Sequence, residues 1–121
     1  MPKTILIVED DEQLSKVLYR QLDAIGYKIL CAYDGETAIK LAREKKPDLM
    51  ILDIGLPGID GKMVCKIVKK HPETAGIKII MLTGDHLVGD MEDTFSYGAE
   101  TYMNKPYDFS LLLSHIEKLI G

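Results

Sequence analysis

Five short runs of β-branched, aliphatic or aromatic residues are spaced along the chain. They cover residues 4–8, 28–33, 49–52, 77–82 and 100–103. Each run is followed at once by a polar residue. Apolar runs of this length are typical of strands that are buried in a sheet. The pattern therefore predicts five strands, of which the last is the shortest.

The segments between these runs carry apolar residues every three or four positions, which predicts helices. The helical patterns cover residues 14–25, 38–42, 61–70, 87–97 and 111–119. Gly26 ends the first pattern, and Asp34 is placed to cap the second. Either Asp108 or Ser110 can cap the last one. The sequence thus alternates predicted strands with predicted helices along its whole length.

Such alternation indicates parallel strands joined by right-handed crossovers, with helices on both faces of the sheet. The 121 residues are enough for one core, and no repeat or linker divides them. We therefore expect a single α/β domain over residues 1–121. Its five-stranded parallel sheet should be doubly wound in the flavodoxin-like order 2-1-3-4-5, with five helices around it.

In a sheet of this kind, ligands bind outside the carboxyl ends of the strands, where the winding changes direction. Four of the predicted strands end in residues suited to chemistry. Glu9 and Asp10 follow the first strand, Asp53 the third, Thr83 the fourth and Lys105 the fifth. A strand-end carboxylate such as Asp53 can serve as a cap or turn residue, but the whole constellation favours chemistry.

The charges of these strand-end residues indicate that they bind a cation. Two carboxylates repel each other by about 4 kcal/mol at roughly 4 Å and an effective dielectric near 20. One ammonium group cannot balance three carboxylates, whereas a divalent cation beside it can. Oxygen ligands with room for water suit Mg²⁺ or Mn²⁺. With Asp53 as nucleophile, Thr83 as hydroxyl donor and Lys105 as a fixed ammonium, the set can accept a phosphoryl group on a carboxylate.

Four short motifs surround these residues. They are ILIVEDD at residues 5–11, DIGLPGIDG at 53–61, TG at 83–84 and KP at 105–106. Each motif is weak alone. Together and in this order, they resemble the receiver domain of two-component response regulators, the CheY-like superfamily, and the resemblance runs from end to end of the chain.

The resemblance implies roles for the acidic residues. Asp53 would be the phosphoacceptor. Mg²⁺ would be bound by Asp10 directly, by Glu9 through a water molecule, by Asp53 and by the backbone carbonyl of Gly55. The phosphodonor would be a phosphohistidine on a sensor histidine kinase or on a histidine phosphotransfer protein. Gly55 brings no side chain to the pocket, which leaves the lifetime of the phosphoryl group open.

The resemblance also implies a switch. Lys105 would pair with the phosphoacceptor or with its phosphoryl group, and the bond between Lys105 and Pro106 would be cis. Thr83 would move toward the phosphoryl group, for which Gly84 leaves room. Tyr102 would move together with Thr83 as the switch aromatic.

The surface that a partner reads would then run from Asp85 to Gly121. Its reader would be a downstream effector or an attached output domain. The resemblance fits both a stand-alone receiver and a receiver that belongs to a longer protein. It also fits both a monomer and a dimer that forms on phosphorylation.

Other functions on the same fold fit the sequence less well, and we do not expect a turnover enzyme. A phosphatase or phosphotransferase of the aspartyl-phosphate type needs a second acid two residues after the nucleophile, where Gly55 stands. A flavin- or nucleotide-binding module needs a glycine-rich phosphate loop, and the acids after the first strand would repel phosphate. A receiver-like module that takes no phosphate would not need the full set of acids, threonine and lysine.

Composition limits the binding partners and the cellular location that we expect. The net charge of −4 disfavours direct binding to nucleic acid. No apolar run reaches the roughly 18 residues of a membrane span, and the first residues do not form a signal-peptide pattern. The two cysteines, Cys31 and Cys65, lack metal-site spacing. We expect them to be reduced, half-buried thiols in a cytoplasmic protein.

Overall fold

The computed structural model describes residues 2–84 and 98–121. Within these residues, the elements in chain order are β1 (Thr4–Val8), α1 (Glu12–Asp23), β2 (Lys28–Ala32), α2 (Gly35–Lys45), β3 (Leu49–Asp53), α3 (Gly61–Lys70), β4 (Lys78–Thr83), β5 (Thr101–Asn104) and α5 (Phe109–Ile120). The predicted helix over residues 87–97 lies outside the described residues. The longest described helices, α1 and α5, have 12 residues each, which is too short to cross a membrane.

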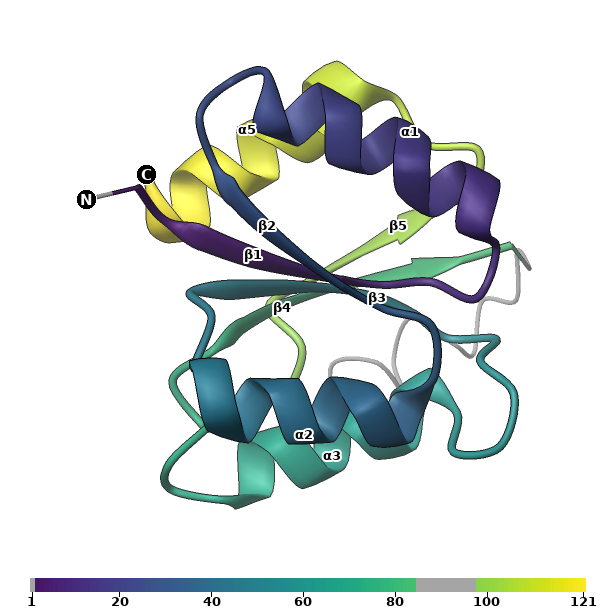
Figure 1. Cartoon of the computed structure of the whole chain (residues 1–121), viewed down its shortest axis with the longest axis vertical. Coiled ribbons are helices and arrows are strands. Elements are labelled where there is room, and N and C mark those ends of the chain that lie inside the picture. Colours follow the sequence, from purple (N-terminus) through teal and green to yellow (C-terminus); the bar gives the residue numbers. More distant parts are fainter. Residues whose placement is uncertain (1, 85–97) are drawn as a thin grey trace.

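The described strands form one parallel sheet in the order β2-β1-β3-β4-β5, which confirms the predicted winding. Helices α1 and α5 cover one face of the sheet, and α2 and α3 cover the other (Figure 1). In the register, Val8 of β1 lies beside Leu52, and Asp53 lies beside Leu82 of β4. The carboxyl ends of the central strands therefore meet at one edge, on the right in Figure 1.

Apolar side chains fill the space on both sides of the sheet. All five residues of β3 are buried, as expected for a central strand covered on both faces. On one side, Ile51 belongs to the same buried cluster as Leu22 of α1; on the other side, Met50 belongs to the same buried cluster as Val64 of α3. Full burial of an aliphatic side chain of this size contributes about 1.5–3 kcal/mol. Cys65 lies in the cluster that contains Met50 and Val64, and it is fully buried because it is on the inner face of α3. The prediction of a half-buried thiol is therefore wrong for Cys65.

An aspartate caps the amino end of each described helix, and its carboxylate accepts a hydrogen bond from a backbone N–H of the first turn. The caps are Asp11 for α1, Asp34 for α2, Asp60 for α3 and Asp108 for α5. The structure thus selects Asp108 over Ser110 for the last helix. A cap of this kind contributes about 1 kcal/mol, and its charge also complements the helix dipole. Because each helix begins after a strand ends, the caps add acidic side chains to the carboxyl edge of the sheet.

Two glycines let α2 and α3 approach the loop that follows β3. A Cβ atom on Gly35 would lie 2.6 Å from the backbone oxygen of Ile59. A Cβ atom on Gly61 would overlap the backbone oxygen of Asp53 and lie 2.7 Å from the Cα atom of Ile54. Backbone atoms cannot rotate away as a side chain can. The loop that begins at Asp53 is therefore held by close contacts on both helices.

We predict that Gly61→Ala lowers the free energy of unfolding by about 2 kcal/mol, because the added methyl group must displace backbone. Gly76→Ala is the matched control. A Cβ atom there would meet no described atom within 4 Å, and the substitution should change stability by less than about 0.5 kcal/mol. Urea unfolding followed by circular dichroism measures both variants. Equal losses in the two would contradict the close packing at Gly61.

Candidate functional site

Asp53 is the last residue of β3, and its position is set by the sheet and by the turn that follows it. The residue is buried, with 6% of its surface exposed. Its Oδ1 atom accepts a hydrogen bond of 3.2 Å from the backbone N–H of Gly55. The backbone N–H of Ile54 donates to the carbonyl of Leu82 at 2.9 Å, which extends the pairing of β3 with β4 past Asp53. The carboxylate thus stands on the rigid end of the central strand.

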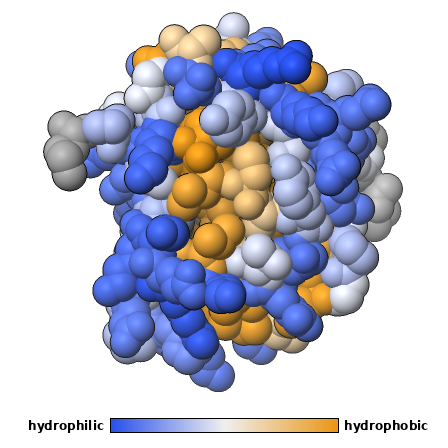
Figure 2. Space-filling model, in the orientation of Figure 1, coloured by the Kyte–Doolittle hydropathy of each residue, from blue (hydrophilic) through white to orange (hydrophobic). Residues whose placement is uncertain are grey.

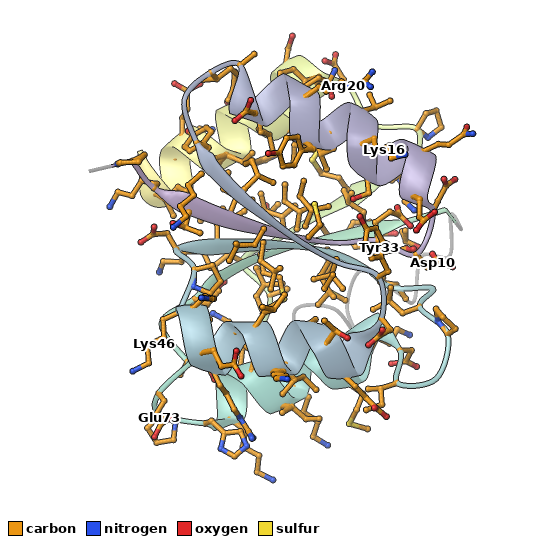
Figure 3. All side chains as sticks on the ribbon, viewed as in Figure 1. Asp10, Lys16, Arg20, Tyr33, Lys46 and Glu73 are labelled. Atoms are coloured by element: carbon orange, nitrogen blue, oxygen red, sulfur yellow. The ribbon has the colours of Figure 1, made fainter. Side chains whose placement is uncertain are left out.

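Glu9 and Asp10 follow β1, the neighbour of β3. Glu9 is 4% exposed, and its Oε2 atom accepts a hydrogen bond of 3.2 Å from the backbone N–H of Asp11. Asp10 is exposed and lies at the carboxyl edge of the sheet, far from the Lys46 and Glu73 end of the molecule (Figure 3). The structure therefore brings a buried acid and an exposed acid from β1 to the end of β3.

Lys105 supplies the positive charge, and it contacts two of the acids. Its Nζ atom lies 2.6 Å from Oε1 of Glu9 and 3.4 Å from Oδ2 of Asp53. Its backbone N–H donates to the carbonyl of Thr83 at 2.7 Å, which fixes the start of the segment after β5. The peptide bond between Lys105 and Pro106 is cis. The shorter of the two contacts is thus with Glu9, whereas the resemblance had pointed to Asp53 as the partner.

Glu9 and Lys105 each shift the pKa of the other. Burial raises the pKa of Glu9 from 4.5 to about 7; the hydrogen bond from Lys105 opposes this rise, and the negative charge of Asp53 adds to it. Burial alone would lower the pKa of Lys105, but the hydrogen bond to Glu9 and the charge of Asp53 outweigh it and raise that pKa above its ordinary value. Near neutral pH, Glu9 is therefore close to its own pKa while Lys105 stays charged.

The three acids form a group that can hold a metal ion. One ligand oxygen from each of Glu9, Asp10 and Asp53 lies within 4.8 Å of the others. Three carboxylates and the ammonium of Lys105 sum to a charge of −2, which a divalent cation would cancel. Carboxylate oxygens are the ligands of hard cations, and the exposed side at Asp10 leaves room for the water molecules that Mg²⁺ retains. The donor set therefore fits a hard divalent ion.

The other predicted residues lie on β4 and β5 or directly after β4. Thr83 is buried at the end of β4, where its register partner on β5 is Asn104. Tyr102 lies two residues before Asn104 and hence on the same face of the strand, and its hydroxyl donates to Oδ1 of Asn104 at 3.0 Å. Gly84 is exposed, and a Cβ atom on it would meet no described atom within 4 Å. Thr83 and Tyr102 thus share one face of neighbouring strands.

Two further residues of the site region were not singled out by the sequence. One is Asn104, which accepts the hydrogen bond from Tyr102. The other is Tyr107, whose pKa is raised by burial and further by the negative charge of Glu9. Its place two residues after Lys105 is the only sequence signal that could have drawn attention to it. The phenol of Tyr107 therefore forms part of the electrostatic surroundings of Glu9.

Comparison with known proteins identifies the family of this arrangement. The family model of the response regulator receiver domain matches residues 5–117. A curated relative, the DNA-binding dual master transcriptional regulator RpaA of Synechocystis sp., is 36% identical over 120 residues. That match covers 99% of this chain and 49% of the relative, so the chain spans about half of the relative's length.

Solved structures show the same similarity. The signal receiver domain of a DNA-binding response regulator protein from Colwellia psychrerythraea is 35% identical, with a TM-score of 0.91 and 98% of each chain covered. The BeF3-activated N-terminal receiver domain of RstA from Klebsiella pneumoniae is 26% identical, with a TM-score of 0.90 and 97% of each chain covered. The sheet order, the acidic group at its carboxyl edge and the family match agree, and the chain belongs to the response regulator receiver domain family.

Proposed function

We propose that this receiver domain takes a phosphoryl group from a phosphohistidine onto Asp53 and signals the event through the surface around β5. The observation that carries the proposal is one cluster: a buried carboxylate at the end of the central strand, two more carboxylates beside it, and an ammonium group 3.4 Å from its Oδ2 atom. The family match supports a signalling role of this kind. We propose no turnover of a free substrate.

The transfer is a substitution at phosphorus. A carboxylate oxygen of Asp53 attacks the phosphorus atom, an O–P bond forms, and the N–P bond to the histidine breaks with its electron pair returning to the imidazole. The transferred group brings negative oxygens into a pocket that already holds acids. Lys105 stands where it can neutralise part of that charge, since its Nζ atom already lies near Asp53. Burial of Asp53 keeps bulk water away from one side of the new bond.

We propose that Mg²⁺ completes the site, with Mn²⁺ as a substitute. Glu9, Asp10 and Asp53 would hold the ion, together with the backbone carbonyl of Gly55. When bound, the ion supplies positive charge for the phosphoryl oxygens. Its binding would also favour the ionised form of Glu9, whose pKa burial raises to about 7 without metal.

The signal would arise from a local charge change. Phosphorylation replaces about one negative charge with nearly two. The new oxygens would draw Lys105 away from its 2.6 Å contact with Glu9 and would attract the hydroxyl of Thr83, with space at Gly84. Tyr102 shares the face of Thr83 and would move with it. Two arrangements whose populations depend on phosphorylation are sufficient for a switch.

The partners follow from the family. We propose a sensor histidine kinase or a histidine phosphotransfer protein as the phosphodonor. The reader would be a downstream effector or an output domain on the surface from Asp85 to Gly121, of which the structure describes residues 98–121. One relative is named as a DNA-binding regulator of about twice this length, which supports an output domain of that kind in some members of the family.

We predict that Asp53→Asn abolishes labelling by acetyl phosphate and Mg²⁺, because the amide is not a nucleophile for phosphorus. The intact mass of the protein measures the label directly. Asp60→Asn is the matched control: it makes the same chemical change at an exposed helix cap, where asparagine also caps well, and it should label like the wild type. A labelled Asp53→Asn protein would contradict the assignment of the acceptor.

We also predict that metal-free protein loses stability as pH rises from 4.5 through about 7. The folded state holds the Glu9 proton in this window and the unfolded state does not, because the pKa of Glu9 is about 7 when folded and near 4.5 when unfolded. The loss is about 3 kcal/mol if the whole shift is expressed. Urea unfolding across this pH range measures the slope.

Two comparisons isolate the contribution of Glu9. Glu9→Gln should remove most of the slope, since the amide does not titrate. Mg²⁺ should restore stability above pH 7 in the wild type, because the ion binds the ionised acids of the folded state. A slope that is unchanged in Glu9→Gln would assign the pH dependence to other groups.

A further inference from the structure

Strand β2 is an edge of the sheet, because β1 is its only partner among the described strands. The backbone N–H of Lys28 donates to the carbonyl of Lys3 at 2.9 Å, and the carbonyl of Ala32 accepts from Glu9 at 3.1 Å. In a parallel strand, alternate residues direct their backbone groups to opposite sides. The N–H and C=O groups of Ile29 and Cys31 therefore point outward, away from β1.

The side chains of this edge are apolar and partly exposed. Ile29, Leu30 and Cys31 are all half-buried, and the only charged residue of the strand is Lys28 at its first position. Figure 2, in which β2 faces the viewer, shows a hydrophobic strip between hydrophilic rims. Exposed edges of natural sheets usually carry charges, prolines or bulges that prevent pairing with another strand. Past its first residue, β2 has none of these.

We propose that β2 pairs with β2 of a second copy of this chain, antiparallel, around a two-fold axis at Leu30. This register places Ile29 of one copy opposite Cys31 of the other, twice. Both residues direct their backbone groups outward, so each of the two pairs exchanges two hydrogen bonds. The outward groups of the edge would all be satisfied, and the apolar side chains of Ile29 and Cys31 would face each other across the interface.

Charge complementarity favours a second copy over an unrelated extended peptide. In the same register, Lys28 lies opposite Ala32 of the second copy, and Asp34 of that copy is two residues further on the same face. Such diagonal neighbours are about 7–8 Å apart, within reach of a lysine side chain. The two-fold axis produces this contact twice. Lys28 is exposed, and Asp34 is half-buried at the start of α2. Both carboxylate oxygens of Asp34 accept hydrogen bonds from Thr37, and the negative charge of the group remains to attract Lys28.

The flanking helices leave room for this pairing. Helix α1 packs on residues of both β1 and β2 on one face, and α2 does so on the other. Each of these helices lies over the space between β1 and β2. If the two β2 strands pair at the usual spacing between strands, such a helix would be about 10 Å from the same helix of the second copy. That is the ordinary distance between packed helices. The paired helices would therefore touch without overlapping.

Sedimentation and cross-linking test the pairing of β2 strands. Neither measurement depends on phosphorylation, so the dimer proposal and the phosphoacceptor proposal can fail independently of each other. Sedimentation of the unphosphorylated chain between about 10 µM and about 1 mM should show a weak, reversible dimer, as expected for a small interface. A bismaleimide that spans about 8 Å should join Cys31 to Cys31, which are diagonal neighbours across the axis. Cys31→Ser should abolish this product, because Cys65 is fully buried.

Single substitutions test whether the dimer forms through the edge strand β2 or through another surface. Cys31→Pro removes an outward N–H without removing a bond to β1, and it should weaken the dimer at least tenfold. Lys28→Glu should weaken it by roughly threefold to tenfold, because two charge pairs become repulsive. Lys118→Glu makes the same charge change on α5 and should have no effect on the dimer. Thermal unfolding and circular dichroism show that each variant is folded.

Two results would overturn the proposal. One is a wild-type chain that remains monomeric up to 1 mM. The other is a dimer whose dissociation constant is the same in Lys28→Glu, Lys118→Glu and the wild type, which would place the contact elsewhere on the molecule.

Discussion

One ammonium group shared by two buried carboxylates is the interaction on which the site depends. Lys105 reaches from the end of β5 to Glu9 at 2.6 Å and to Asp53 at 3.4 Å. Without it, two acids that are each nine-tenths buried or more would stand side by side and would lose the ammonium group that contacts both of them. With it, the cluster still carries an excess of negative charge. Under the proposed function, that excess would favour binding of a divalent cation, and the cation together with Lys105 would then favour a phosphoryl group between them.

The fold produces this arrangement from segments far apart in the chain. Parallel strands deliver their carboxyl ends to one edge, so residues 9, 53 and 105 meet although β1, β3 and β5 lie far apart in sequence. Close packing at Gly35 and Gly61 holds the loop after Asp53. The hydrogen bond from the backbone of Lys105 to Thr83 holds the other side. The site is therefore stiff where charge must be positioned, whereas Asp10 and Gly84 are exposed among the residues that the structure describes.

Sequence reasoning predicted the strands and the group of acids from local signals, and it predicted the strand order from the alternation of strands with helices along the chain. The apolar run that ends at Asp53 is one such signal, and the aspartate before each helix is another. The preference of Lys105 for Glu9 was not predictable, since it depends on where a flexible side chain ends after the chain has folded. The hydrogen bond between Tyr102 and Asn104 was missed for the same reason. The predicted order already placed the second strand at an edge, but the partial exposure of its apolar side chains and the direction of its backbone groups became clear only from the folded structure.

The affinity for Mg²⁺ tests the shared charge most directly, by calorimetric titration of metal-free protein at about pH 8, above the pKa of Glu9. Lys105→Met removes the cation that competes for the acids, whereas Asp10→Asn removes a ligand. If the acids are balanced by one lysine and one metal ion, Lys105→Met should bind Mg²⁺ more tightly than the wild type, and Asp10→Asn more weakly. Unchanged or weaker binding in Lys105→Met would contradict the account.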